Sequence, residues 1–152
     1  MKLRLVDRIL DYSPWASIRG TKAVSFEEYS AASATSAARE LPRSLMLQSI
    51  MDLANWLAIV SSQFQTIALP LEWEQVSYAS GLGPGERMLL HVRVRESTDG
   101  RIVIDGHGCV EQRQTIVVQS CVMGLAPLAA HYDAPDLRVL FGELQRPEGV
   151  RM

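Results

Sequence analysis

Three polar side chains share one face of an otherwise apolar segment. Between about residues 44 and 63 nearly every side chain is hydrophobic, which is typical of a helix surrounded by the rest of its fold. The exceptions include Gln48, Asp52 and Asn55, whose spacings of four and three residues bring them together on one helical face. A carboxyl group between two amides can bind a polar ligand or act as a general base. This face is therefore the first candidate site.

Each of these residues also has a structural explanation. A buried amide such as Gln48 must find hydrogen-bond partners worth about 1–3 kcal/mol, so it either caps local backbone groups or contacts a bound ligand. Asp52 is either a general base or a structural carboxylate bonded to backbone amides or to an arginine. Ser44, at the start of the helix, completes the set of candidate substrate-binding residues with Gln48, Asp52 and Asn55.

Length and composition predict one compact domain. The chain has 152 residues, of which 47% are hydrophobic and 21% charged, enough to bury a core. Its net charge is -2, and it has no run of lysine or arginine. Because binding of nucleic-acid phosphates needs clustered positive charge, neither DNA nor RNA is an expected partner.

The cysteines and the N-terminus favour a cytoplasmic location. Cys109 and Cys121 are too few for a disulfide-stapled secreted domain, and no secretion signal is evident. The apolar helix is long enough to cross a bilayer, but an aspartate near its centre would cost about 2.5–3.5 kcal/mol, so we expect no membrane span. No cluster of His, Cys and Asp has the spacing of metal ligands, so neither a metal nor another cofactor is expected.

The pattern of apolar residues changes from helical to alternating along the chain. Pro42 is placed to begin the long helix, since the first turn tolerates proline. Later segments alternate, as where Met88, Leu90 and Val92 are separated by more polar residues. Strands are predicted over residues 3–12, 17–25, 71–80, 86–96, 101–112 and 115–128.

The order of these elements predicts an α+β chain with the hotdog fold, in which one antiparallel sheet wraps around one long central helix. We expect the hotdog domain to cover residues 1–130. Residues 131–152, rich in Pro, Asp and Arg, are expected to form a peripheral C-terminal tail. Such a sheet leaves an edge strand exposed, so a homodimer that covers the edge is expected.

Three segments resemble the 3-hydroxyacyl-acyl-carrier-protein dehydratases of fatty acid synthesis. Residues 5–12 and 18–24, with a proline turn between them, are similar to that family's N-terminal hairpin. The run that begins Pro42-Arg43-Ser44 resembles the opening of its central helix, and Gly83-Pro84-Gly85-Glu86 resembles its proline-glycine-acid turn. The likeness covers roughly residues 3–128. It implies an acyl thioester ligand, carried by acyl carrier protein or by coenzyme A, in a tunnel beside the helix.

The resemblance also implies a catalytic pair that this sequence lacks. The family uses a histidine in a loop before the helix and a Glu or Asp in the helix, two groups with opposed protonation states. Counted without gaps from Pro42, the histidine position falls on Ala34 and the carboxyl position on Gln48. Neither side chain transfers protons near neutral pH. The chain's three histidines follow the helix in sequence and are poor replacements: His91, His107 and His131.

Three functional interpretations remain open. The first is a non-catalytic acyl-thioester-binding protein, paired with itself or with a second hotdog protein in fatty acid or polyene biosynthesis. The second is a divergent 3-hydroxyacyl-acyl-carrier-protein dehydratase, a lyase. The third is an acyl thioesterase in which Asp52 is the general base.

Overall fold

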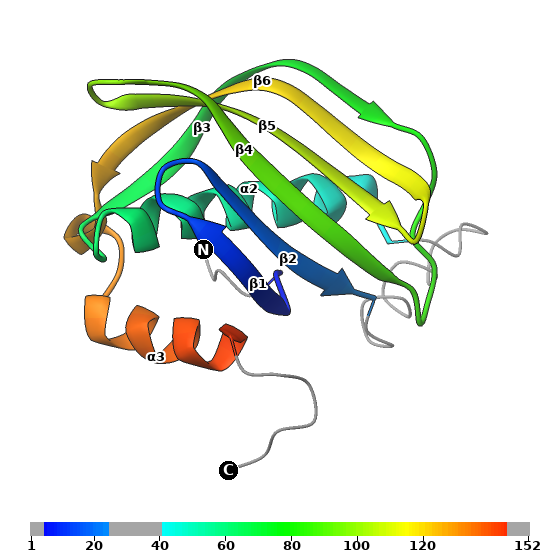
Figure 1. The fold of residues 1–152 in the computed structure, drawn as a ribbon, viewed down its shortest axis with the longest axis horizontal. Helices are drawn as coiled ribbons and strands as arrows, with labels where there is room; N and C mark the ends of the chain where they lie inside the picture. The colour runs from blue at the N-terminus through cyan, green and yellow to red at the C-terminus, as the bar shows by residue number, and fades with distance from the viewer. Residues whose placement is uncertain (1–4, 25–40, 146–152) are drawn as a thin grey trace.

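A computed structural model describes residues 5–24 and 41–145, which form a curved sheet with two helices and one 3-10 helix (Figure 1). The strands are β1 (Arg8–Ser13), β2 (Ser17–Ala23), β3 (Thr66–Tyr78), β4 (Arg87–Thr98), β5 (Arg101–Val110) and β6 (Arg113–Pro127). The helices are α2 (Arg43–Ser61), η1 (Leu128–Ala130) and α3 (Ala134–Gln145). The sheet has six antiparallel strands in the order β1-β2-β4-β5-β6-β3, and its concave face holds α2. The α+β class and the wrapped central helix are confirmed.

Strand β3 begins earlier than the sequence predicts. The alternating pattern predicts a start at residue 71, but the strand begins at Thr66 and contains Pro70. Proline cannot donate a backbone hydrogen bond, so it is tolerated in sheets mainly on edge strands and at bulges. Because β3 is the edge strand and has a register shift at Pro70, the proline fits within the strand.

Two glycines let α2 approach the sheet closely. A Cβ atom on Gly106 of β5 would lie 2.7 Å from the Ile50 side chain, and one on Gly20 of β2 would lie 3.1 Å from the Leu53 side chain. Both distances are shorter than normal packing, so a larger residue would push the helix away. α2 is long and apolar enough to cross a membrane by length and composition, but 72% of that stretch is buried inside the fold. It is therefore the core helix of the described fold.

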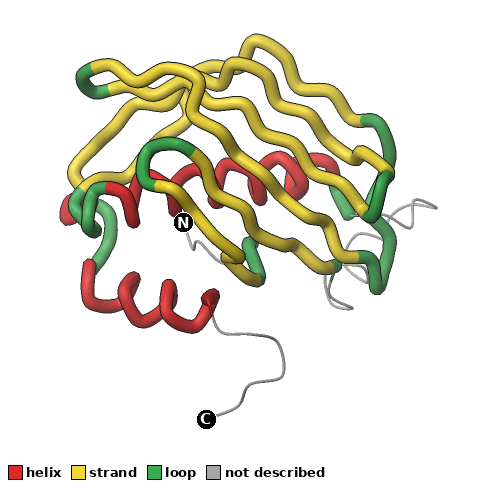
Figure 2. The backbone as a smooth tube through the Cα atoms, viewed as in Figure 1, coloured by secondary structure: helices red, strands yellow, loops and turns green. Residues whose placement is uncertain are grey.

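Helix α3 occupies part of the expected C-terminal tail. The composition of residues 131–152 predicts a peripheral segment, whereas the structure has a helix there (Figure 2). Leu137 and Leu144 of this helix belong to the hydrophobic core. Phe141 places its ring 5.7 Å from Trp56 of α2 and 6.0 Å from Tyr12 of β1. The apolar spacing of three and four residues was readable in the sequence. The boundary at residue 130 between the hotdog domain and a C-terminal tail remains a prediction.

Candidate functional site

The polar stripe of α2 faces away from the two glycines at which the helix packs most closely on the sheet, and its Asn55 reaches the edge strand β3. Ile50 and Leu53 pack against the sheet at Gly106 and Gly20. At about 100° per residue, Gln48, Asp52 and Asn55 point in roughly the opposite direction. Asp52 and Asn55 are buried, Gln48 is partly buried, and Ser44 in the first helical turn is exposed. Gln48, Asp52 and Asn55 therefore form one buried or partly buried group on α2. Ser44 is exposed to solvent and does not belong to this group.

The two carboxyl oxygens of Asp52 are buried and differ in their hydrogen bonding. The Asp52 side chain is 1% exposed, and the Gln48 amide donates a hydrogen bond of 2.9 Å to Oδ1. Oδ2 is also buried and accepts no well-formed hydrogen bond from the residues that the structure describes. Native structures rarely leave such an atom without a partner, and each case calls for an explanation such as a water, an ion or a catalytic role.

Burial raises the pKa of Asp52 above the ordinary aspartate value, because the charged form loses its hydration. The Gln48 amide, the Leu5 backbone N–H and the charge of Lys22 act in the opposite direction and lower this pKa, although the Leu5 contact falls short of a well-formed hydrogen bond. The net result is a carboxyl group that titrates closer to neutrality than a surface aspartate. General acids and bases in enzymes are tuned in this way.

Two further residues near Asp52 were not among the candidates. Burial raises the pKa of Tyr132, and the charge of Asp52 raises it further, which places the phenol near the carboxyl group. Lys22 of β2 is 2% exposed and its charge acts on Asp52. The alternation of Ile18, Gly20 and Lys22 on the inner face of β2 could have identified the lysine. No sequence signal points to Tyr132, because it lies between two short helices outside the expected sheet.

Asn55 has a structural contact. Its amide oxygen accepts a buried hydrogen bond of 3.0 Å from the backbone N–H of Ala68, near the start of the edge strand β3. A buried N–H without a partner would cost about 1–3 kcal/mol, so Asn55 stabilises the connection between α2 and the sheet. Its role in substrate binding remains a prediction.

The histidines do not replace the missing catalytic pair within one described chain. His91 and His107 alternate with buried residues that face α2, so their rings lie on the outer face of the sheet. Asp52 lies on the far side of α2, so the sheet and the helix separate it from both rings. His131 is exposed after η1. Ala34, where the resemblance places the family histidine, lies outside the described residues.

The cysteines are not suited to nucleophilic chemistry at this site. Burial raises the pKa of the Cys121 thiol to about 12, so the thiol is protonated at neutral pH. Cys109 is partly buried on the outer side of β5, and the ring of His107 on the same strand packs against His91. Neither thiol lies on the polar stripe of α2.

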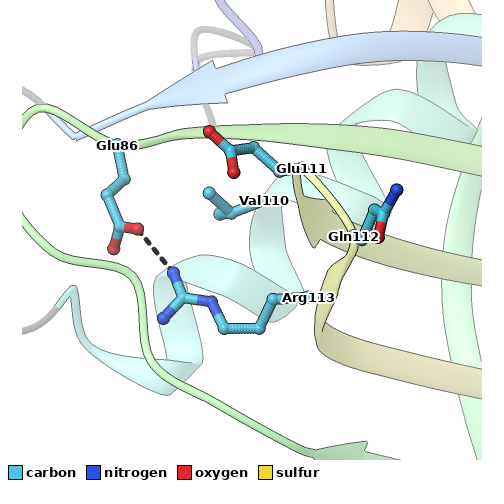
Figure 3. A pocket seen from close by; sticks show the side chains of 5 residues that line it. All are labelled: Glu86, Val110, Glu111, Gln112 and Arg113. Carbon is cyan, nitrogen blue, oxygen red and sulfur yellow. Dashed lines mark hydrogen bonds and ion pairs between the residues drawn. The ribbon is translucent and has the colours of Figure 1, made fainter.

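The three cavities described here lie away from that stripe. The largest, about 420 Å³, is a surface hollow beside the turn between β5 and β6 (Figure 3). Glu86 and Arg113 point toward each other across it and form an ion pair of 2.5 Å. Glu86 also accepts a 2.8 Å hydrogen bond from the Gly83 N–H, so the acid of the family-like turn stabilises the turn. The other two, of about 390 and 330 Å³, are lined by turns and by β3 and β6. The acyl tunnel remains a prediction.

Comparison of the sequence with protein-family models and with curated protein sequences gives no match. The fold, however, is similar to many solved structures. One is smu.793 from Streptococcus mutans UA159 bound to acetyl-CoA, with a TM-score of 0.64 and 10% identity over 79% of this chain and 88% of that chain. A second is a hypothetical thioesterase from Streptococcus pneumoniae TIGR4 with coenzyme A, with a TM-score of 0.65 and 7% identity over 83% and 91%.

A third is the PaaI protein from the phenylacetic acid degradation operon of E. coli, with a TM-score of 0.60 and 10% identity over 78% of this chain and 79% of that one. Identities this low establish the architecture and not the activity. The chain therefore has the hotdog fold, and these likenesses do not single out the dehydratases within it.

Proposed function

We propose that the protein is an acyl-CoA thioesterase in which Asp52 is the general base. The observation that carries this proposal is the buried Oδ2 atom of Asp52, which lacks a well-formed hydrogen bond among the described residues. A water molecule bound there would satisfy this atom and would be held by a carboxyl group of raised pKa. Two structural neighbours, smu.793 and the pneumococcal protein, hold acetyl-CoA and coenzyme A, which supports a coenzyme A thioester as the ligand.

The proposed reaction is hydrolysis. The ionised Asp52 takes a proton from the bound water, and the water oxygen attacks the thioester carbonyl carbon. The carbon–sulfur bond then breaks, and the thiol leaves with a proton while the acyl group becomes a carboxylic acid. Gln48 holds Oδ1 of Asp52 in place through its amide N–H, which leaves Oδ2 to the water.

We also propose that two chains associate through β3. This edge strand exposes Leu71 and Trp73, 55% and 41% accessible, along a strand of 13 residues. A long apolar edge favours pairing with another strand, and an identical chain offers the same edge. We retain the prediction of a cytoplasmic location and of a thioester on coenzyme A; acyl carrier protein as an alternative carrier rests on the sequence resemblance alone.

A second candidate is a non-catalytic acyl-thioester-binding protein that pairs with itself or with another hotdog chain. It is favoured by Gln48, which occupies the position where the resemblance places a catalytic carboxyl group. It is also favoured by the Gln48 contact with Asp52, since a satisfied amide–carboxyl pair can be purely structural. The divergent dehydratase has only the sequence resemblance in its support.

Thiol release from acyl-CoA esters of several chain lengths distinguishes these functions. We expect hydrolysis by the natural protein and a loss of about 10²–10⁴-fold in Asp52→Asn, the range typical of a general base. The rate should rise with pH as Asp52 ionises, because its pKa is raised above 3.8. Asp11→Asn, on the exposed side of β1, is the matched control and should hydrolyse at the natural rate.

Binding without hydrolysis in the natural protein would replace the thioesterase with the non-catalytic candidate. Dehydration of a 3-hydroxyacyl thioester that survives Gln48→Ala would establish the dehydratase by a different mechanism. Hydrolysis at the natural rate by Asp52→Asn would show that Asp52 is not the general base.

A further inference from the structure

Two histidines form a facing pair on the outer face of the sheet. Strands β4 and β5 lie side by side in the sheet (Figure 1). Their register places His91 directly opposite His107. Their ring centres are 5.3 Å apart and the ring planes are nearly perpendicular, at 88°. His107 is exposed and His91 is partly buried. The proposed thioesterase chemistry uses neither residue.

The distance between the two ring centres matches the distance expected when two imidazoles bind the same metal ion. Zinc binds imidazole nitrogens at about 2.0–2.1 Å in tetrahedral geometry, which puts the centres of two such rings about 5 Å apart. The rings already have this separation, so rotation about the side-chain bonds can turn one nitrogen of each toward a shared ion. Both backbones are fixed by strand pairing, which holds the pair together before an ion arrives.

We infer that His91 and His107 bind one divalent transition-metal ion, such as Zn²⁺, Ni²⁺ or Cu²⁺, on the outer face of the sheet. Imidazole is a preferred ligand for these ions. Within residues 5–24 and 41–145, no group of three or more His, Cys, Asp or Glu is arranged to hold a metal. The two imidazoles therefore act as a bidentate pair, with water in the remaining positions.

Three arginines and two carboxylates surround the pair. Arg19 of β2 lies beside His91 in the register, and Asp11 of β1 binds its guanidinium through hydrogen bonds that include one of 3.0 Å. Arg93 and Arg95 of β4 both lie near Asp105 of β5, at 3.8 and 3.3 Å. These carboxylates offset part of the repulsion that the nearby guanidinium groups would exert on a bound cation.

The surroundings keep His91 in the neutral form that metal binding requires, and the positive charges among them also repel a cation. Burial lowers the pKa of His91, and the charges of His107, Arg19 and Arg93 lower it further, while Asp11 acts in the opposite direction. A lowered pKa means that more of the imidazole is neutral at pH 7, and only the neutral ring has a free lone pair. Binding should weaken as the pH falls through the histidine range.

Calorimetric titration with Ni²⁺, Zn²⁺ and Cu²⁺ tests this site. We expect one ion per chain, with Cu²⁺ bound more tightly than Ni²⁺. His91→Gln and His107→Gln should each weaken Ni²⁺ binding by about tenfold or more, because a single imidazole cannot chelate. His131→Gln removes an exposed histidine after η1 and is the matched control, with unchanged affinity.

Melting temperatures provide a second measurement, which distinguishes loss of metal binding from misfolding of a variant. The ion binds the folded chain, so it should raise the melting temperature of the natural protein and of His131→Gln, and leave both pair variants unchanged. Melting temperatures without metal show whether each variant is folded. Stoichiometric binding that persists in both pair variants, or no measurable binding by the natural protein at millimolar Ni²⁺, would overturn the inference.

Discussion

Asp52 and Asp11 are the same residue type in two regions of one fold, and their carboxyl groups are perturbed in opposite directions. Asp52 lies under the central helix, where loss of hydration raises its pKa. Asp11 lies on the exposed outer face, where a hydrogen bond from Arg19 lowers its pKa. The difference shows that the surroundings, and not the residue type, decide the direction in which the pKa of a carboxyl group is shifted.

The two regions also differ in what a polar group contributes to stability. On the outer face, side chains remain in water and their ion pairs add little. Under the helix, each polar atom needs a partner in the protein or an ordered water molecule, because bulk water does not reach it. Asn55 has such a partner in the Ala68 N–H, whereas Oδ2 of Asp52 has no well-formed one among the described residues.

The largest expected effect on stability comes from Asn55→Ala. The substitution leaves the buried Ala68 N–H without an acceptor and should lower the free energy of unfolding by about 1–3 kcal/mol. Urea unfolding measures the change. Gln119→Ala, on the exposed side of β6, should change stability by less than about 0.5 kcal/mol. Equal effects at Asn55 and Gln119 would contradict the contrast between the two regions.

The pH dependence of stability should have opposite signs for the two aspartates. Because the folded pKa of Asp52 is raised, the natural protein loses stability relative to Asp52→Asn as pH rises from about 4 toward neutrality. Because the folded pKa of Asp11 is lowered, the natural protein loses stability relative to Asp11→Asn only as pH falls below about 4. Urea unfolding over a pH series measures both slopes, and slopes of the same sign would refute the assignment.

The smallest effect is expected for Arg19→Gln. Asp11 and Arg19 are both about half-exposed, so the loss of their ion pair should leave the melting temperature at neutral pH nearly unchanged. The variant should nevertheless raise the pKa of Asp11 toward its ordinary value, which NMR titration of the carboxyl carbon can follow. A large drop in melting temperature would show that the outer face contributes more to stability than its exposure suggests.

Much of the fold could be predicted from residue patterns. The apolar helix, the alternating strands after it and their order predict the hotdog architecture, and the structure contains them. The early start of β3 was missed because Pro70 resembles a strand breaker unless its edge position is known. Helix α3 was missed because residues 131–152 are rich in Pro, Asp and Arg, although Leu137, Phe141 and Leu144 recur at helical spacing.

The candidate site was predicted less completely. The spacing of Gln48, Asp52 and Asn55 was enough to place them on one face, since helical geometry depends only on local distances. The proximity of Tyr132 and Lys22 to Asp52 could not be read from spacing, because both come from distant segments of the chain. The partner of Asn55 is a backbone group, and side-chain patterns carry no information about it.

The sequence by itself determined the periodic features: a helix that must be buried, its polar stripe, and a sheet with one wet face. Only the tertiary structure decided that Oδ2 of Asp52 lacks a well-formed hydrogen bond among the described residues, and that His91 and His107 face each other. The physical reason is that periodicity arises from the backbone geometry of neighbouring residues. Hydrogen-bond partners and strand register depend on contacts between segments far apart in the chain.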